Sequence, residues 1–115
     1  MAFVLGERVK ETTNVSGTAN ITFNGAAPTF KTFASVLRAG DQTTYAISNE
    51  QTQEFEVGQG VFDGTTLSRD KVYASSNGDN LVNFGSETKE VYISYTAKNA
   101  CTFQTATGLA IALGA

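Results

Sequence analysis

Short strand-like runs separated by turn residues fill most of this chain and constrain its fold more than any other feature. Along residues 54–62, large apolar side chains alternate with polar or small ones, and a hairpin turn signal, Asp63-Gly64, follows. The same period of two recurs in residues 21–24, 43–48 and 90–96. The sixteen threonines favour strands, whereas the serines, asparagines and glycines favour turns. The sequence therefore predicts an all-β antiparallel fold, either a sandwich or a partly open barrel.

One segment departs from the strand pattern. Phe33, Val36 and Leu37 have the spacing of one side of a helix, and Thr32 precedes them as an N-cap candidate. Two helical turns are marginal in water unless their apolar side is buried. We therefore expect one short helix at about residues 32–39, docked on the sheet.

The alternation over residues 54–62 also predicts which side chains are buried. We expect Phe55, Val57 and Val61 to face the core, and Glu54 and Glu56 to face solvent or a subunit boundary. The stretch Gly58-Gln59-Gly60 lies before no helix and lacks a third glycine, so it does not predict a dinucleotide loop. It predicts a bulge or a close approach of two backbones.

Composition argues against several classes of function. The chain has no histidine and a single cysteine, Cys101, which excludes histidine-based metal sites, histidine-based triads and internal disulfides. Its net charge is −3 with scattered cations, and it has no long apolar run, so we expect neither nucleic acid nor a membrane as a partner. We also expect no secretory signal, because the apolar start of the chain is too short for one.

Two groups of polar residues are candidate sites. Glu54 and Glu56 have the separation of a glycosidase pair, but two carboxylates on one strand more often form a solvated face. Residues 77–80 carry calcium-binding oxygens without the spacing of a known calcium loop, and a turn is the better interpretation. We therefore expect no catalytic, cofactor-binding or metal-binding residues.

The end of the chain differs from the rest. Residues 1–98 form the expected β-rich module, whereas residues 99–115 carry no charged side chain. Within this tail Leu109, Ile111 and Leu113 alternate with glycine and alanine. This pattern predicts a strand with large apolar side chains on one face and only small residues on the other. Such a strand needs a partner surface, which its own sheet or a neighbouring subunit could provide, and we expect it to contact another subunit or to insert in a shared sheet.

Several segments, taken in order, resemble a small β-rich virion module of tailed bacteriophages. That module opens tail-fibre and tailspike-like proteins and also occurs as a short stand-alone virion protein. The resemblance covers roughly residues 7–96 and rests on these stretches: residues 7–13, 17–18, 43–47, 54–58, 66–70, 74–78, 82–84 and 89–92. The 115 residues of this chain do not include the long shaft or receptor-binding domain of the fibre pattern, so we expect an adaptor, anchor or cement role in place of direct host recognition.

The resemblance implies a non-enzymatic virion protein, made in the host cytoplasm and assembled into the particle. The expected role is a tail or fibre-attachment adaptor, with a capsid decoration protein and a host-surface carbohydrate-binding module as alternatives. The expected partners are other copies of the chain, most simply a homotrimer, and other virion proteins. Candidate assembly residues are Leu109, Ile111 and Leu113 in the tail, with Arg8 and Lys10 in the N-terminal arm.

Overall fold

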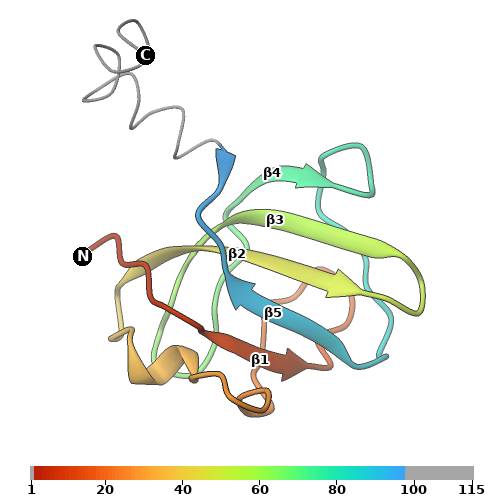
Figure 1. Cartoon of the computed structure of the whole chain (residues 1–115). Helices are drawn as coiled ribbons and strands as arrows, with labels where there is room; N and C mark the ends of the chain where they lie inside the picture. Colours follow the sequence, from red (N-terminus) through yellow and green to blue (C-terminus); the bar gives the residue numbers. More distant parts are fainter. Residues whose placement is uncertain (1, 98–115) are drawn as a thin grey trace, which may run out of the picture.

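The computed structural model describes residues 2–97, and its framework is one five-stranded antiparallel sheet. The strands lie in the order β1-β5-β2-β3-β4, as Figure 1 shows. Their bounds are β1, Lys10–Thr13; β2, Gln42–Asn49; β3, Glu54–Val61; β4, Lys71–Ser75; and β5, Lys89–Ile93. The prediction of an all-β antiparallel fold is thus confirmed. Within residues 2–97, no helix has the length and apolar character that crossing a membrane requires.

The hairpin of β2 and β3 forms the centre of the sheet. Its register runs from Gln42 opposite Val61 to Asn49 opposite Glu54, and β5 pairs with the other edge of β2. In this register Tyr45 and Ile47 of β2 lie on the same face as Val91 of β5. All three side chains are buried, so this face is the inner face of the sheet.

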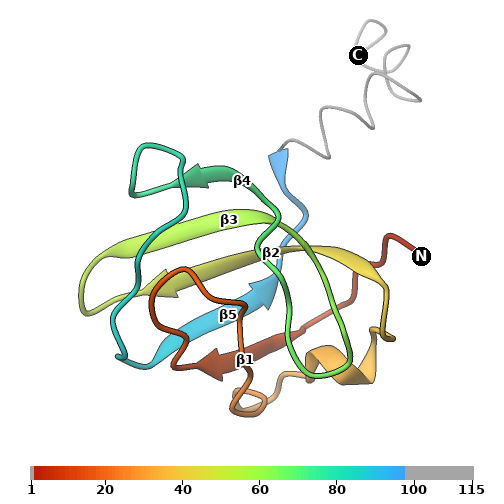
Figure 2. The ribbon, with the colours of Figure 1, turned by 180° about the vertical axis from the view of Figure 1, so that it is seen from behind.

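Loops cover the inner face in place of a second sheet. Figure 2 shows the segments between β1 and β2, between β3 and β4, and between β4 and β5 on this side. Isolated bridges connect them, with Ile21 opposite Leu67 and Gly17 opposite Phe84. The core that they enclose with the sheet consists of Val9, Ile21, Phe33, Leu37, Tyr45, Ile47, Phe62, Leu67, Val82, Phe84 and Val91.

The expected helix is shorter than the sequence pattern predicts. A single 3-10 turn, η1, spans Phe33–Ser35, with Thr32 as its N-cap accepting a hydrogen bond from the Ser35 amide at 3.2 Å. Phe33 and Leu37 are buried as the apolar spacing predicts. The chain turns away soon after Leu37, because the Asp41 carboxylate accepts a hydrogen bond from the Arg38 amide at 2.8 Å.

The faces of β3 are opposite to those predicted. Glu56 is inaccessible to solvent, whereas Phe55 is 42% exposed and Val57 and Val61 are only partly buried. Alternation defines two faces of a strand but does not say which one is covered. Here the choice follows from the register, because Gly58 lies opposite the buried Tyr45 and shares its inner face.

The two glycines of β3 explain why this face is inner. A Cβ on Gly60 would lie 1.7 Å from the carbonyl oxygen of Ser68, and one on Gly58 would lie 2.1 Å from that of Lys71. Hydrogen at both positions lets the segment that leads into β4 lie directly against β3. A register shift between Val57 and Gly58 accompanies this contact. The predicted bulge and close backbone approach are both confirmed.

Two phenylalanine variants test this assignment of faces. Phe33→Ala should lower the free energy of unfolding by about 3–5 kcal/mol, the usual range for a buried aromatic side chain. Phe55→Ala should lower it by about 1 kcal/mol or less, as expected for an exposed side chain. Urea denaturation of the two variants and the wild type measures both values. Equal losses would contradict the outward orientation of Phe55.

Candidate functional site

A buried ion pair lies at the centre of the inner face. The Glu56 carboxylate accepts two hydrogen bonds from Arg69, from Nη2 to Oε1 at 2.6 Å and from Nε to Oε2 at 2.8 Å. The Tyr45 hydroxyl donates to the same carboxylate at 2.6 Å, and the Val82 amide donates at 2.9 Å. Both charged side chains are almost inaccessible to solvent. The pair is therefore fully hydrogen-bonded within the protein.

The same guanidinium holds two of the covering loops. Arg69 donates from Nη1 to the carbonyls of Gly17 and Ala19, each at 3.2 Å, and from Nη2 to the carbonyl of Val82 at 2.7 Å. Arg69 is itself buried, with 8% of its surface exposed. The sequence offered no signal for its burial, because its partner Glu56 lies thirteen residues away on a strand whose faces were reversed.

These contacts set the ionisation of the network. Burial by itself raises the pKa of Glu56, but hydrogen bonds from Arg69, Tyr45 and Val82 outweigh burial and hold that pKa below 4.5. Burial lowers the pKa of Arg69, and the Glu56 carboxylate more than compensates. Burial and the hydrogen bond to Glu56 both raise the pKa of Tyr45. At neutral pH the pair is charged and the phenol is protonated.

This geometry does not suit the glycosidase interpretation of Glu54 and Glu56. Glu56 is buried, ionised and engaged by four donors, so it can neither reach a substrate nor supply a proton to one. The Glu54 carboxylate accepts a hydrogen bond from Thr52 at 2.8 Å. The carboxylate of Glu56 serves to connect the sheet to its loops.

Two further buried charges also bind loop backbone. Glu11 accepts hydrogen bonds from the amides of Gly25 at 3.1 Å and Phe33 at 2.7 Å. Lys89 donates to the carbonyls of Gly85 and Glu87, and burial lowers its pKa. Both residues lie at the ends of the segments that cover the inner face. Their role is structural, and no pattern in the sequence indicated it.

The turn at residues 77–80 is also held by its own side chains and backbone. Asp79 has a φ of 65° and accepts a hydrogen bond from the Ser75 amide at 3.0 Å, and the Asn80 amide donates to the Asn77 carbonyl. Across residues 2–97, no group of three or more potential metal-ligating side chains comes together. The turn interpretation fits this geometry.

The outer face of the sheet is the second candidate site. On this face the central strand β2 carries small side chains, Thr44, Ala46 and Ser48, between β3 and β5, and of these Thr44 and Ala46 are buried. In the register, Ala46 lies between Val57 and Tyr92. The larger side chains of the flanking strands therefore form the accessible part of this face.

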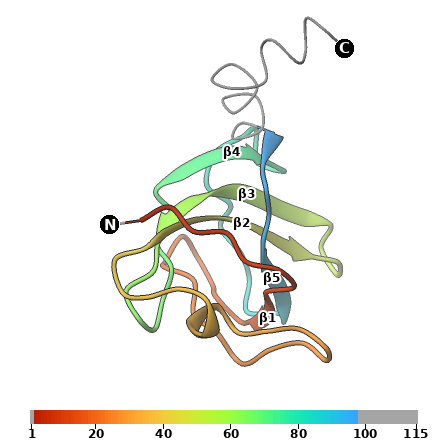
Figure 3. The same ribbon diagram turned by 60° about the vertical axis from the view of Figure 1, so that its left-hand side comes forward.

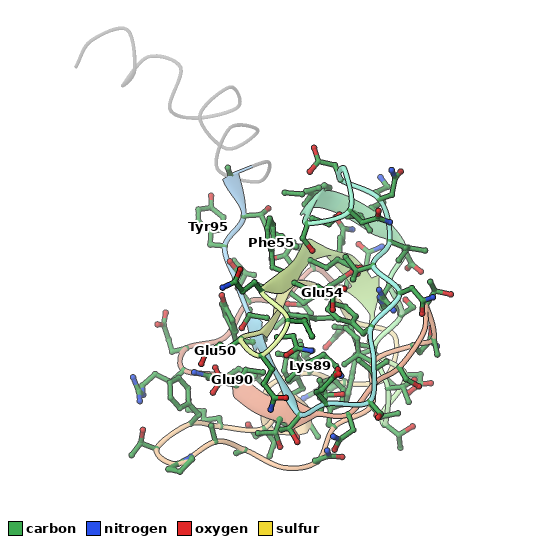
Figure 4. The ribbon with its side chains drawn as sticks, turned by 90° about the vertical axis from the view of Figure 1, so that its right-hand side faces the viewer. Glu50, Glu54, Phe55, Lys89, Glu90 and Tyr95 are labelled. Carbon is green, nitrogen blue, oxygen red and sulfur yellow. The ribbon has the colours of Figure 1, made fainter. Side chains whose placement is uncertain are left out.

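Exposed aromatic side chains lie on this outer face. Phe55 is 42% exposed, Tyr92 36% and Tyr95 54%. Figure 4 shows Phe55 and Tyr95 on the same side of the sheet as Glu50 and Glu90, and Lys89 on the other. The loops that cover the inner face lie on the opposite side, and of the described residues the segment after β5, residues 94–97, passes along the outer face (Figure 3). Clustered exposed aromatic residues indicate a surface that binds a partner.

One side of the outer face brings together the two predicted N-terminal interface residues. Arg8 and Lys10 border a groove of about 510 Å³ that also contains Phe30, Tyr92, Glu50 and Glu90. The Arg8 guanidinium lies 4.2 Å from the centre of the Phe30 ring and the Lys10 ammonium 5.0 Å from it. Lys10 also pairs with Glu90 at 3.1 Å. This groove is therefore of mixed charge.

The backbone beside this groove is unusual. Arg8 and Thr29 have positive φ angles of 54° and 69°, which is uncommon for any residue with a side chain and costly for a β-branched one. Arg8 donates from Nη2 to the Thr29 hydroxyl at 2.7 Å and from Nε to its carbonyl at 3.2 Å. The two residues thus hold each other, and Arg8 keeps its stacking position over Phe30.

A second groove, of about 440 Å³, lies at the β4 side of the outer face. Val57, Tyr73 and Ala74 form its floor, and residues 94–97 form its wall. No charged side chain lines it among the described residues. The remaining predicted interface residues, Leu109, Ile111 and Leu113, lie outside the described residues.

Comparison with known proteins returned nothing: no family model, no characterised protein and no solved structure matches this chain.

The Glu56–Arg69 pair can be tested by single and double substitution. Glu56→Gln or Arg69→Met alone leaves a buried charge without its partner and should lower the free energy of unfolding by about 3–5 kcal/mol. The double variant should lose less than the sum of the two single losses, because neither charge remains. Denaturant titration of all four proteins measures the coupling. Strictly additive losses would show that the pair does not act as a unit.

The low pKa of Glu56 also predicts how acid affects stability. A carboxylate whose pKa is lower in the folded than in the unfolded protein stabilises the fold above the unfolded value, near 4.5, and this stabilisation is lost as pH falls through the folded value. The wild type should therefore lose stability below about pH 4.5 more steeply than the Glu56→Gln, Arg69→Met double variant. The Asp63 carboxylate, whose pKa is lowered to about 2 by the amides of Thr66 and Thr65, contributes equally to both. Identical acid profiles would contradict the assignment.

Proposed function

We propose that this chain is a non-enzymatic virion structural protein of a tailed bacteriophage, acting as an adaptor at the tail or fibre-attachment region. The observation that supports an assembly role best is the outer face of the sheet. There the side chains of Phe55, Tyr92 and Tyr95 are exposed to solvent. The phage context rests on the ordered segments described above, which resemble virion modules.

The distribution of charge is consistent with this role. The inner charges Glu11, Glu56, Arg69 and Lys89 are all engaged in holding loops. A rigid inner side and an exposed aromatic outer side suit a protein that joins other subunits through one face. The partners are further copies of the chain, in a homotrimer, and other virion proteins.

A capsid decoration protein would use the same face, and position in the particle distinguishes the two roles. Cryo-electron microscopy of particles that contain this chain should show its density at the tail or at fibre attachment sites. Density on the head lattice would favour decoration instead. Absence of the chain from purified particles would overturn both roles.

One observation favours carbohydrate binding as a second candidate. The groove beside Tyr92 places an exposed aromatic ring next to polar side chains of Ser48, Glu50 and Glu90, an arrangement that suits a sugar ring and its hydroxyls. Binding of the isolated protein to a glycan array, lost in Tyr92→Ala, would support this role.

Two sets of variants test the outer face directly. The double variant Phe55→Ser, Tyr92→Ser removes two aromatic anchors, each worth about 1.5–3 kcal/mol when buried, so incorporation into particles should fall at least about tenfold. Leu81→Ser is the matched control, because Leu81 is 37% exposed and lies outside the sheet. Quantitative immunoblotting of purified particles gives the incorporated amount, and thermal unfolding checks that each variant is folded. Equal incorporation of the double variant and the control would contradict the proposed surface.

A further inference from the structure

The groove at the β4 side of the outer face differs in charge from the groove beside Arg8 and Lys10. Its floor consists of Val57 and Ala74, which lie opposite each other on β3 and β4, together with Tyr73. Tyr95, on its wall, is 54% exposed. The groove beside Arg8, by contrast, contains both cations and carboxylates. An apolar segment without charge is therefore suited to the β4 groove and not to the other.

The sheet can also accept another strand beside this groove. Among the described strands, β4 lies at the end of the sheet and pairs with β3 alone. The edge of a sheet offers backbone donors and acceptors to an added strand, while alternate side chains of that strand enter neighbouring pockets. The floor residues Tyr73 and Ala74 belong to this edge strand.

The chain itself carries a segment with the required pattern. Residues 99–115 have no charged side chain, and Leu109, Ile111 and Leu113 alternate with small residues. In a strand, three anchors would face one way, and the glycines and alanines between them would let a neighbouring backbone approach. One residue separates this segment from residues 94–97, which line the groove.

We infer that the β4 groove binds residues 107–113 of a second copy of this chain. The inference rests on the proposed assembly function and names the partner at that face. In this arrangement the apolar side chains of the segment pack in the uncharged groove. The backbone of the segment, in a strand, pairs with the open edge of β4. Repeated around an axis, the same exchange produces a closed ring such as the proposed trimer.

The path of the chain favours a second copy over the same molecule. Figures 1 and 3 show that the chain leaves β5, passes β2 and β3 and reaches the level of β4, where its last described residues point away from the sheet. Residues 98–106 can span up to about 30 Å when extended, which is enough to reach an adjacent subunit.

Thiol cross-linking between differently tagged full-length chains tests this inference. In a Cys101→Ser background, one chain carries Ala74→Cys and the other Ile111→Cys, and the mixture is treated with a short bismaleimide. Docking raises the effective concentration of the two thiols, so the mixed dimer should exceed that of the control pair by roughly tenfold or more. The control pair replaces Ala74→Cys by Ala34→Cys, an exposed position in η1.

A chain carrying both Ala74→Cys and Ile111→Cys shows whether the groove binds the segment of a second copy or the segment of the same chain. Cross-linking between chains supports the inference. Cross-linking confined within single chains shows that the segment occupies its own groove and overturns it, and the absence of cross-links above the control overturns it as well. The outcome is independent of the particle map: loss of cross-linking with density still present at the tail would reject this groove while leaving the proposed function in place.

Discussion

The buried pair of Glu56 and Arg69 is the interaction on which the rest of the structure depends. A single sheet with one face covered by irregular loops has few regular hydrogen bonds to hold that cover. Arg69 supplies them, since it joins a carboxylate on the central hairpin to backbone carbonyls of two different loops. The glycines of β3 complete the arrangement by letting the segment that carries Arg69 lie against the strand.

This use of the inner face determines what is left for function. Because β3 directs Glu56, Gly58 and Gly60 inward, its larger apolar side chains point outward with Tyr92 of β5. The exposed aromatic face is thus a consequence of the inner network. A β-rich module of this kind can keep its covering loops fixed while the opposite side binds other subunits.

Features that depend on local patterns could be predicted from the sequence. They are the fold class, most strand positions, the cap at Thr32 and the backbone approach at Gly58 and Gly60. The orientation of Phe55 and Glu56 could not be predicted, since it depends on a cross-strand neighbour and on a salt bridge between distant residues. Arg8 and Lys10 were identified as interface candidates, and the structure brings them together at Phe30. The exposure of Tyr92 and Tyr95 could not be predicted, because alternation does not reveal which face of a sheet remains uncovered.

The central claim is that the outer face becomes buried when the protein assembles. Hydroxyl-radical footprinting of the isolated chain and of the intact particle measures this at individual side chains. The account predicts that Phe55, Tyr92 and Tyr95 are oxidised in the isolated protein and protected in the particle, while Phe3, which is 44% exposed and lies outside the sheet, remains oxidised in both. Equal oxidation of the three aromatic residues in the two states would contradict it.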